Sequence, residues 1–399
     1  MGAKKHTGQS VFGGSLMPPF LVLKNSALTN NLGQMREFCE RNNVELAPHC
    51  KTHMSPELWR LQEEFGASLA TVANVAQAEV FFSHGVERIL IANEVVERQD
   101  LSAIVRMRRE RASFEISILV DSVAAVAVIT AVLEEIASDL APLQVLIEFG
   151  APGRRAGCRT PEEVVAVAEA VDAATSLELV GLEGYEGVFG PVSAAERSQA
   201  IDGYLDSAAE IIRTLIDKRL VAQPTIATFG GSRYYPAVID RIRNQFSSEK
   251  VSVILRSGCY LTHDHGTYAR SHAEVLSTVG KPDLKPAIEV WGAVLSTPEP
   301  GLAIVGIGKR DVSYDEGMPI VLARYRDGTI SAVSGMHVAK LNDQHAYLEL
   351  GTADSTEFCV GDLVAFGISH PCTTFDKWRS ALLVDDEYRV VDVAHTFFH

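Results

Sequence analysis

The sequence of residues 45–59, ELAPHCKTHMSPELW, contains a short apolar run, a polar turn and the start of a helix. Ser55 is a hydroxyl residue that can cap this helix, and Pro56 suits the first helical turn. Thr160-Pro161 repeats the arrangement further along the chain. A strand–turn–helix unit that recurs in this way favours an α/β fold.

Apolar runs rich in β-branched residues are separated by longer segments with helical spacing. The runs cover residues 45–50, 69–73, 88–92, 115–121, 143–149, 178–184, 224–229 and 251–255. Near-continuous apolar runs are typical of parallel strands buried on both faces, and eight strands each followed by a helix form a (β/α)8 barrel. The sequence therefore predicts this barrel over residues 21–285. An open, doubly wound sheet is the alternative.

The pattern changes after about residue 285. Runs such as AIEVWGAVLST, GLAIVGIG and DLVAFGI are strand-like and are separated by Gly, Pro and Asp turns, without a long amphipathic helix between them. We expect an all-β domain over residues 286–399. Residues 1–20 are strand-like or loose and could join that domain.

Composition narrows the function classes. The 399 residues carry 36 basic and 51 acidic side chains, a net charge of −15, which disfavours nucleic acid or an anionic membrane as a partner. No apolar run approaches the roughly 18–20 residues that span a bilayer, and the N-terminus lacks the apolar core of a secretory signal. The six cysteines are scattered singly, as in reduced cytoplasmic proteins. We expect a soluble cytoplasmic protein.

A lysine follows the first predicted strand, at the barrel rim where chemistry is expected. Lys51 is unusual there, because removing an ammonium from water is costly. An imine formed with an aldehyde cofactor would remove the charge and create an electrophile. The alternative is a lysine whose ammonium reaches solvent at the barrel mouth.

Two glycine-containing turns follow the last two predicted strands. They are Gly230, Gly231 and Ser232 after the seventh strand, and Gly258, Cys259 and Tyr260 after the eighth. These loops form the usual phosphate site of this barrel, and neither has the GxGxxG pattern of a dinucleotide fold. Together with Lys51 they fit a phosphorylated aldehyde that bridges the barrel mouth. Two ordinary turns remain the alternative.

Further polar residues could face the same compound. Arg155, in the turn PGRRAG, could contact its ring or phenolate, although a surface arginine fits equally well. In the β domain, His370 and Cys372 would lie on one face of an extended chain. Imidazole and thiolate form a partial zinc-type site that substrate, water or a distant side chain must complete, and a chance pair is the alternative. Other possible neighbours, without an assigned role, are His49, His53, Asp264, His337 and His345.

The stretch PHCKTHMSPELW resembles the cofactor-lysine signature of the D-serine dehydratase and D-threonine aldolase family. These are pyridoxal-phosphate enzymes of the alanine-racemase-like fold, and bacterial D-serine deaminase-like members are the most similar. EFGAPGRRAG, EGYEGV, FGGS, RSGCY and SHPCTTFDKW are similar to further family landmarks and occur in the same order. The resemblance therefore covers nearly the whole chain.

The resemblance implies a role for each matched residue. Lys51 would form the Schiff base with pyridoxal 5'-phosphate, and Arg155 and Tyr185 would approach its ring. Residues around the phosphate would be Gly230, Gly231, Ser232, Gly258, Cys259 and Tyr260, partly through the backbone. His370 and Cys372 would bind a divalent metal, zinc first, with manganese or cobalt as substitutes. A homodimer with sites formed by both subunits is also implied.

The resemblance also implies the reaction class. We expect a dehydratase that converts a D-β-hydroxy-amino acid such as D-serine or D-threonine to a 2-oxo acid and ammonia, because dehydratase members tend to carry Cys where Cys372 stands. Aldolase members tend to carry Asp there and release glycine and an aldehyde. An amino-acid racemase needs a second base, which we cannot assign. A non-catalytic cofactor-binding protein of this fold would lack the C-terminal β domain.

Overall fold

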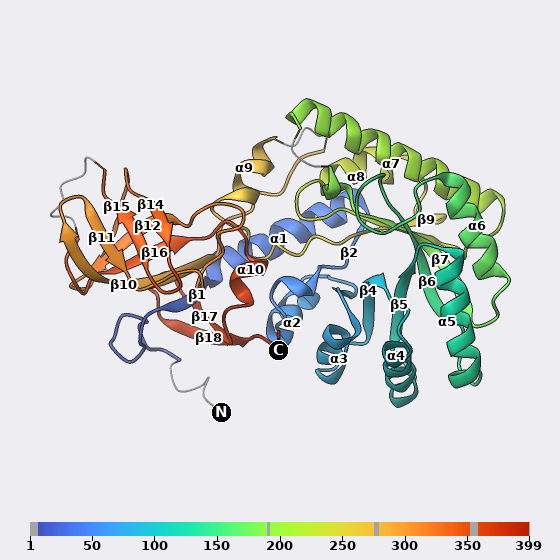
Figure 1. The fold of residues 1–399 in the computed structure, drawn as a ribbon, viewed down its shortest axis with the longest axis horizontal. Helices are drawn as coiled ribbons and strands as arrows, with labels where there is room; N and C mark the ends of the chain where they lie inside the picture. Colours follow the sequence, from blue (N-terminus) through green and yellow to red (C-terminus); the bar gives the residue numbers. More distant parts are fainter. Residues whose placement is uncertain (1–6, 190–191, 275–278, 352–357, 399) are drawn as a thin grey trace.

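The computed structural model describes residues 7–189, 192–274, 279–351 and 358–398. Two β-sheets lie at opposite ends of an elongated molecule, with a helix-covered parallel sheet at one end and a second, mainly antiparallel sheet at the other (Figure 1). The short helix α10 (Cys372–Phe375) and helix α2 (Pro56–Glu64) lie between them.

The first sheet is the expected (β/α)8 barrel. Its strands are β2 (Glu45–Leu46), β3 (Ala70–Val72), β4 (Arg88–Glu94), β5 (Glu115–Val120), β6 (Leu143–Phe149), β7 (Leu177–Gly184), β8 (Thr225–Phe229) and β9 (Val251–Leu255). They pair in the order β2-β9-β8-β7-β6-β5-β4-β3, always in parallel. Parallel bridges from Leu46 to Ala67 and from His49 to Thr71 join the two ends of this order. The prediction of a barrel rather than an open sheet is confirmed.

Side chains fill the barrel, as in other folds of this type. One cluster of buried residues inside it consists of Ala47, Leu69, Leu90, Leu119, Leu146, Val180 and Ile254, which come from seven different strand segments. The barrel interior is therefore a packed core at the level of these residues.

Helix α1 (Asn25–Asn42) follows β1 and precedes the first barrel strand, β2. The helices that follow barrel strands are α2, α3 (Val75–Ser83), α4 (Arg98–Glu110), α5 (Val123–Ile136), α6 (Pro161–Asp172), α7 (Ala194–Asp217), α8 (Tyr235–Arg241) and α9 (Thr267–Glu274), with 3-10 turns η2 (Cys50–Thr52), η3 (Glu186–Val188) and η4 (Arg243–Gln245). Both caps expected from the sequence are present. Ser55 Oγ accepts a hydrogen bond from the Leu58 N–H at 3.4 Å, and Thr160 Oγ1 accepts one from the Glu163 N–H at 3.2 Å.

The second sheet contains the C-terminal strands and one N-terminal strand. The strands are β1 (Phe20–Lys24), β10 (Ile288–Glu299), β11 (Leu302–Val305), β12 (Ile320–Arg326), β13 (Thr329–Ala332), β14 (His337–Leu341), β15 (Ala346–Glu349), β16 (Leu363–Gly367), β17 (Ser380–Val384) and β18 (Val390–His395). β1 lies between β10 and β17, antiparallel to the first and parallel to the second. The division at residue 285 stays a prediction, but residues 20–24 pair outside the barrel.

The β domain touches the barrel mouth through a few specific contacts. The Phe397 N–H donates to the Met54 carbonyl at 2.9 Å, and the His265 N–H donates to the Ile368 carbonyl at 3.1 Å. The Cys372 thiol donates to Thr52 Oγ1 at 3.4 Å. These contacts join the loops that follow β2 and β9 to the loop after β16 and to the segment after β18, so side chains from both domains meet at the mouth.

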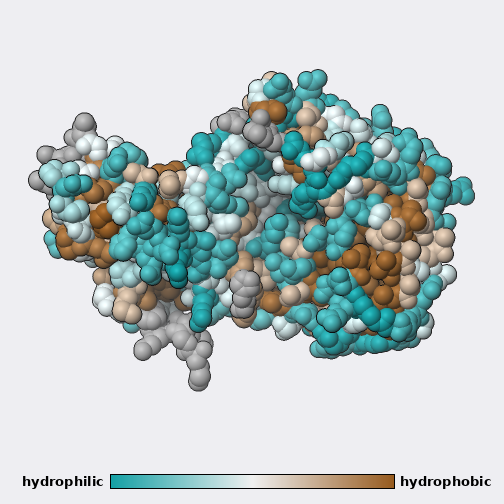
Figure 2. All heavy atoms as spheres, in the orientation of Figure 1, coloured by the Kyte–Doolittle hydropathy of each residue, from teal (hydrophilic) through white to brown (hydrophobic). Residues whose placement is uncertain are grey.

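Apolar residues also reach the surface at the barrel end of the face in Figure 2. On α5, the side chains of Val123 and Val128 are 51% and 48% exposed. Within the described ranges, however, none of the helices is both long enough and apolar enough to cross a membrane.

The packing of β7 against β8 gives a stability prediction. A methyl group at Gly181 would overlap the backbone carbonyl of Ile226 on the neighbouring strand. Gly181→Ala should therefore lower the free energy of unfolding by about 1–3 kcal/mol, measured by urea denaturation.

Gly203→Ala is the matched control. Gly203 lies within α7, and nothing lies within 4 Å of the position of an added methyl group. This substitution should raise stability by roughly 0.5–1 kcal/mol, because alanine favours the helix. Equal effects of the two substitutions would contradict the strand packing described here.

Candidate active site

A cavity of about 460 Å³ lies at the C-terminal ends of the barrel strands. It is lined by His49, Lys51, Thr52, Ala73, Ala92, Asn93, Arg155, Glu183, Tyr185, Gly231, Ser232, Arg256, Gly258, Cys259, Tyr268, His370 and Cys372. The set contains most of the site residues expected from the sequence. The exceptions are Gly230, which precedes a lining residue, and Tyr260.

Lys51 lies in the 3-10 turn η2, within the loop that follows the short strand β2. Its side chain is exposed to the cavity, but the cavity walls still remove part of the water around the ammonium. This burial lowers the pKa of Lys51, and the positive charge of Arg155 lowers it further. The sulfurs of Cys372 and Cys259 raise the pKa of Lys51, but by less than burial lowers it. The amine is therefore neutral at a lower pH than an ordinary lysine.

Two backbone N–H groups converge on one oxygen in the loop after β9. The N–H groups of Gly258 and Cys259 donate to Ser232 Oγ at 3.1 and 2.9 Å. A methyl group at Gly258 would lie 2.5 Å from the His49 carbonyl oxygen, so glycine permits the close approach of the two loops. Converging N–H donors of this kind are suited to an anion such as phosphate.

The N–H groups of Gly230 and Gly231, after β8, bind a side chain of the protein itself. The Glu186 carboxylate, which is fully buried, accepts hydrogen bonds from the N–H groups of Gly230 and Gly231 at 3.0 and 2.8 Å. These two N–H groups are therefore occupied by a protein carboxylate. A methyl group at Gly231 would lie 2.5 Å from the Tyr185 ring, so this glycine gives the ring its place in the cavity wall.

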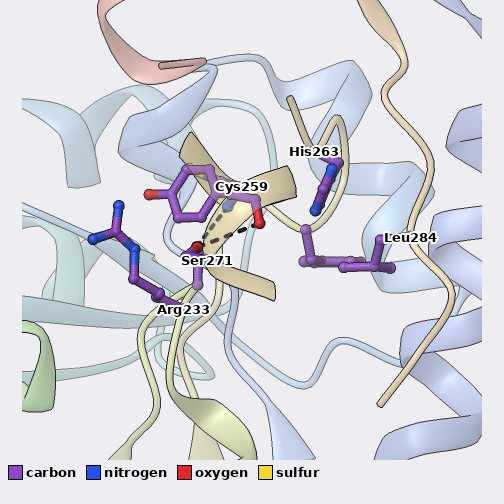
Figure 3. A pocket seen from close by; sticks show the side chains of 8 residues that line it. Arg233, Cys259, His263, Ser271 and Leu284 are labelled. Carbon is purple, nitrogen blue, oxygen red and sulfur yellow. Dashed lines mark hydrogen bonds between the residues drawn. The ribbon is translucent and has the colours of Figure 1, made fainter. Parts of the chain in front are cut away.

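Tyr260 lines a second, smaller hollow on the other side of Cys259 (Figure 3). Arg233 and His263 lie on opposite sides of this hollow, and Ser232, Cys259 and Tyr268 line both spaces. The Tyr260 side chain is 2% exposed. Its expected role near the phosphate stays a prediction.

Arg155 and Tyr185 lie next to each other on the cavity wall. The Arg155 guanidinium is 5.7 Å from the centre of the Tyr185 ring, within the range of a cation–π contact. Although 36% of Tyr185 faces the cavity, burial of its hydroxyl and the nearby Glu186 carboxylate raise the pKa of Tyr185 to about 12. Tyr185 therefore presents a neutral hydroxyl and an aromatic face to the cavity.

Arg256 is a site residue to which we assigned no role from the sequence. It forms a buried ion pair with Glu183 and donates to the carbonyls of Thr228 and Gly184 at 3.0 and 2.9 Å. Arg256 and Glu183 are 5% and 3% exposed, and both line the cavity floor. The position of Arg256 after β9 was visible in the sequence, but nothing marked Glu183 as its partner.

The expected extended geometry of His370 and Cys372 is wrong. Pro371 between them has helical torsion angles (φ −56°, ψ −45°), and Cys372 begins helix α10, because the proline ring suits a helix start. Both side chains nevertheless line the cavity. His370 Nδ1 is 2.7 Å from the Asp315 carboxylate, which also accepts from Thr373 Oγ1 at 3.0 Å. A carboxylate that orients an imidazole in this way is typical of metal-binding histidines.

Cys372 also contacts a second cysteine. Its Sγ lies 3.6 Å from Cys259 Sγ, in the loop after β9. Because the two groups share a hydrogen bond, the pKa of Cys259 is lowered and the pKa of Cys372 is raised. Among the described residues, no group of three or more His, Cys, Asp or Glu side chains is already arranged to hold a metal ion.

The remaining polar candidates have different surroundings. His49 lines the cavity, and its buried Nδ1 has no hydrogen-bond partner. His53 is buried against Gln62 at 3.1 Å, and the Asp264 carboxylate accepts from the Gly266 and Tyr268 N–H groups. His337 forms an exposed pair with Glu349, and His345 is exposed on the β domain. Only His49 among them belongs to the cavity.

The cavity fits the groups that the sequence suggested. A lysine amine, an aromatic wall and two converging N–H donors match the aldehyde, ring and phosphate of pyridoxal phosphate. Thiol and imidazole are donors that zinc prefers, and His370 already has an orienting carboxylate.

Comparisons with known proteins identify related domains and enzymes. The alanine racemase N-terminal domain model matches residues 23–233, and the model described as "Putative serine dehydratase domain" matches residues 287–384. The chain is 26% identical to a 3-hydroxy-D-aspartate aldolase of Paracoccus denitrificans, over 84% of this chain and 80% of that protein. It is 31% identical to a D-threo-3-hydroxyaspartate dehydratase of Delftia sp., over 36% of each.

A solved structure extends the comparison to the fold. The D-threonine aldolase from Filomicrobium marinum superposes with a TM-score of 0.78 and is 24% identical, covering 96% of this chain and 95% of that one. The similarity therefore includes the barrel and the β domain together.

The charges around Lys51 give a testable prediction. Arg155→Met removes a positive charge that lowers the pKa of Lys51, so this pKa should rise. In cofactor-free protein, the pH at which Lys51 reacts at half its maximal rate with an amine reagent should move upward. Arg154→Met, which changes the neighbouring exposed arginine, should leave it unchanged. Equal shifts in both variants would contradict a specific effect of Arg155.

Proposed function

This chain belongs to the alanine racemase N-terminal domain family, and on that premise we propose that it is a pyridoxal-phosphate- and metal-dependent dehydratase of D-β-hydroxy-amino acids. The products would be a 2-oxo acid and ammonia. The observation that carries the proposal is that one cavity is lined by Lys51 of the barrel and by His370 and Cys372 of the β domain.

Several residues of the chain support binding of the cofactor. When bound, pyridoxal phosphate supplies an electron sink that makes the Cα proton of an amino acid acidic. Burial lowers the pKa of Lys51, so its free amine can accept that proton at a lower pH than an ordinary lysine would. The N–H groups of Gly258 and Cys259 can bind a phosphate oxygen in place of Ser232 Oγ. Arg256, held by Glu183, presents a fixed positive charge to the cavity floor.

The β domain supports a metal role. A zinc ion on His370 and Cys372 would act as a Lewis acid for the β-hydroxyl, which is a poor leaving group; manganese or cobalt could substitute. A D-threo-3-hydroxyaspartate dehydratase of the same fold has been solved as a cysteine-to-alanine variant in a metal-free form. Asp315 orients His370, and Thr373 orients Asp315 in turn.

An aldolase is the second candidate, because the aldolase relative aligns over 84% of this chain and the dehydratase relative over 36%. It would release glycine and an aldehyde from the same substrates. We favour the dehydratase because Cys372 stands at a position where the resemblance associates cysteine with dehydratases. The same resemblance supports a homodimer. The six free cysteines, including the exposed Cys359, support a reducing cytoplasm.

A panel of D-β-hydroxy-amino acids tests the proposal. Purified protein, supplied with pyridoxal phosphate and zinc, is assayed with D-serine, D-threonine and D-threo-3-hydroxyaspartate, scoring 2-oxo acid, ammonia, glycine and aldehyde separately. We expect oxo acid and ammonia in equal amounts, and loss of both with a chelator. Formation of glycine and an aldehyde instead would show that the protein is an aldolase. Turnover that continues in the presence of the chelator would refute the metal role.

The cofactor attachment gives a second prediction. Borohydride treatment of the reconstituted protein should fix the cofactor onto one peptide, which mass spectrometry should map to Lys51. Lys51→Ala should lose the label and the activity. Lys250→Ala, which changes an exposed lysine at the start of β9, should keep both. A label on another residue would refute the assignment.

The Asp315–His370 contact gives a third prediction. Asp315→Leu should weaken zinc binding about 10- to 100-fold, because the imidazole loses the carboxylate that orients it. Asp315→Asn should lose less, since its amide oxygen can still accept the Nδ1 proton. Affinity is measured by competition with a coloured chelator. Asp343→Leu, at an exposed pair with Arg310, is the control and should bind zinc normally.

A further inference from the structure

We propose that Cys259 is a metal ligand alongside Cys372, so that the metal lies between the barrel and the β domain. The inference rests on the proposed metal dependence and adds a second sulfur to it. It also gives the Cys259 side chain a role separate from that of its backbone, whose N–H group faces the phosphate cradle.

The distance between the two sulfurs carries the proposal. Cys259 Sγ and Cys372 Sγ are 3.6 Å apart. Two thiolates on one tetrahedral zinc, each about 2.3 Å from the metal, are separated by about 3.8 Å. The pair therefore needs almost no movement to bind one ion. A disulfide would require the sulfurs to close to about 2.05 Å.

The position of the pair supports the same role. Both cysteines line the cavity next to Lys51, and both sulfurs act electrostatically on its ammonium. Thr52 Oγ1 lies 3.8 Å from Cys259 Sγ and 3.4 Å from Cys372 Sγ. Both thiols therefore lie next to η2, the 3-10 turn that contains Lys51. A metal held at this point would lie in the same cavity as the Lys51 amine.

The charge balance is favourable. Two thiols that bind one divalent cation release two protons, and the resulting site is neutral. The cation takes the place of the hydrogen that the sulfurs now share. His370, which lines the same cavity, can supply a third ligand and leave a fourth position for water or substrate, as in catalytic zinc sites.

Cobalt(II) reports the number of sulfur ligands directly. The reduced protein, with native thiols verified by titration, is loaded with one equivalent of cobalt, and the thiolate-to-cobalt absorption in the near ultraviolet is measured. We expect Cys259→Ser and Cys372→Ser each to lose about half of the absorption per bound cobalt. Cys158→Ser, which changes a buried cysteine that does not line the cavity, should keep all of it.

The result that overturns the inference is wild-type absorption in Cys259→Ser. Absence of any such absorption in the unaltered protein would instead refute the metal role in the proposed function, so the two failures are distinguishable. A persistent Cys259–Cys372 disulfide in reduced, cobalt-treated protein would also overturn the inference.

An alkylation experiment on the unaltered protein tests the same inference without any variant, so it does not require a substituted protein to fold. Zinc should protect both Cys259 and Cys372 from iodoacetamide at least several-fold, as mapped by mass spectrometry, while the exposed Cys359 reacts as before. Protection of Cys372 alone would overturn the role of Cys259.

Discussion

Closure of the barrel through its shortest strand is the constraint on which the site depends. β2 has two residues, yet Glu45 and Leu46 pair with Ile254 and Leu255 of β9, and His49 bridges to the segment of β3. Parallel pairing fixes the register, so the loops after β2 and β9 leave the sheet side by side. Lys51 therefore meets the Gly258–Cys259 turn although the two are far apart in the chain. The pairing of β2 with β9 is thus what brings the amine next to the Gly258 and Cys259 N–H groups.

The β domain completes the site by approaching this same junction. Its contribution comes from one loop, in which the helix start at Pro371 turns Cys372 toward Thr52 and Cys259 while His370 remains against Asp315. Cys259 lies where the two parts meet: its N–H group donates to Ser232 Oγ, and its sulfur lies against Cys372 of the β domain. In the proposed function, this single turn would couple cofactor binding to metal binding.

The fold could be predicted because parallel strands buried on both faces leave apolar runs in the sequence, and all eight appear in the structure near their expected positions. The residues at the strand ends could be predicted for the same reason. Contacts across the chain could not. Asp315 and His370, or Glu183 and Arg256, have no spacing that relates them, and both pairs depend on how loops pack. The extended geometry expected for His370 and Cys372 failed because a proline between them favours a helical turn.

Strand β1 has a consequence for how the protein is made. It precedes every barrel strand in the chain, yet its two neighbours in the sheet are β10 and β17, and Val22 pairs with Leu382. The barrel segments are translated between these partners, so they can collapse while β1 still exposes unpaired backbone on both edges. Completion of the second sheet must wait until β17 has been translated, and such long-range pairing is slow and prone to aggregation. The β1 segment of the nascent chain therefore benefits from chaperone protection until its partners have been made.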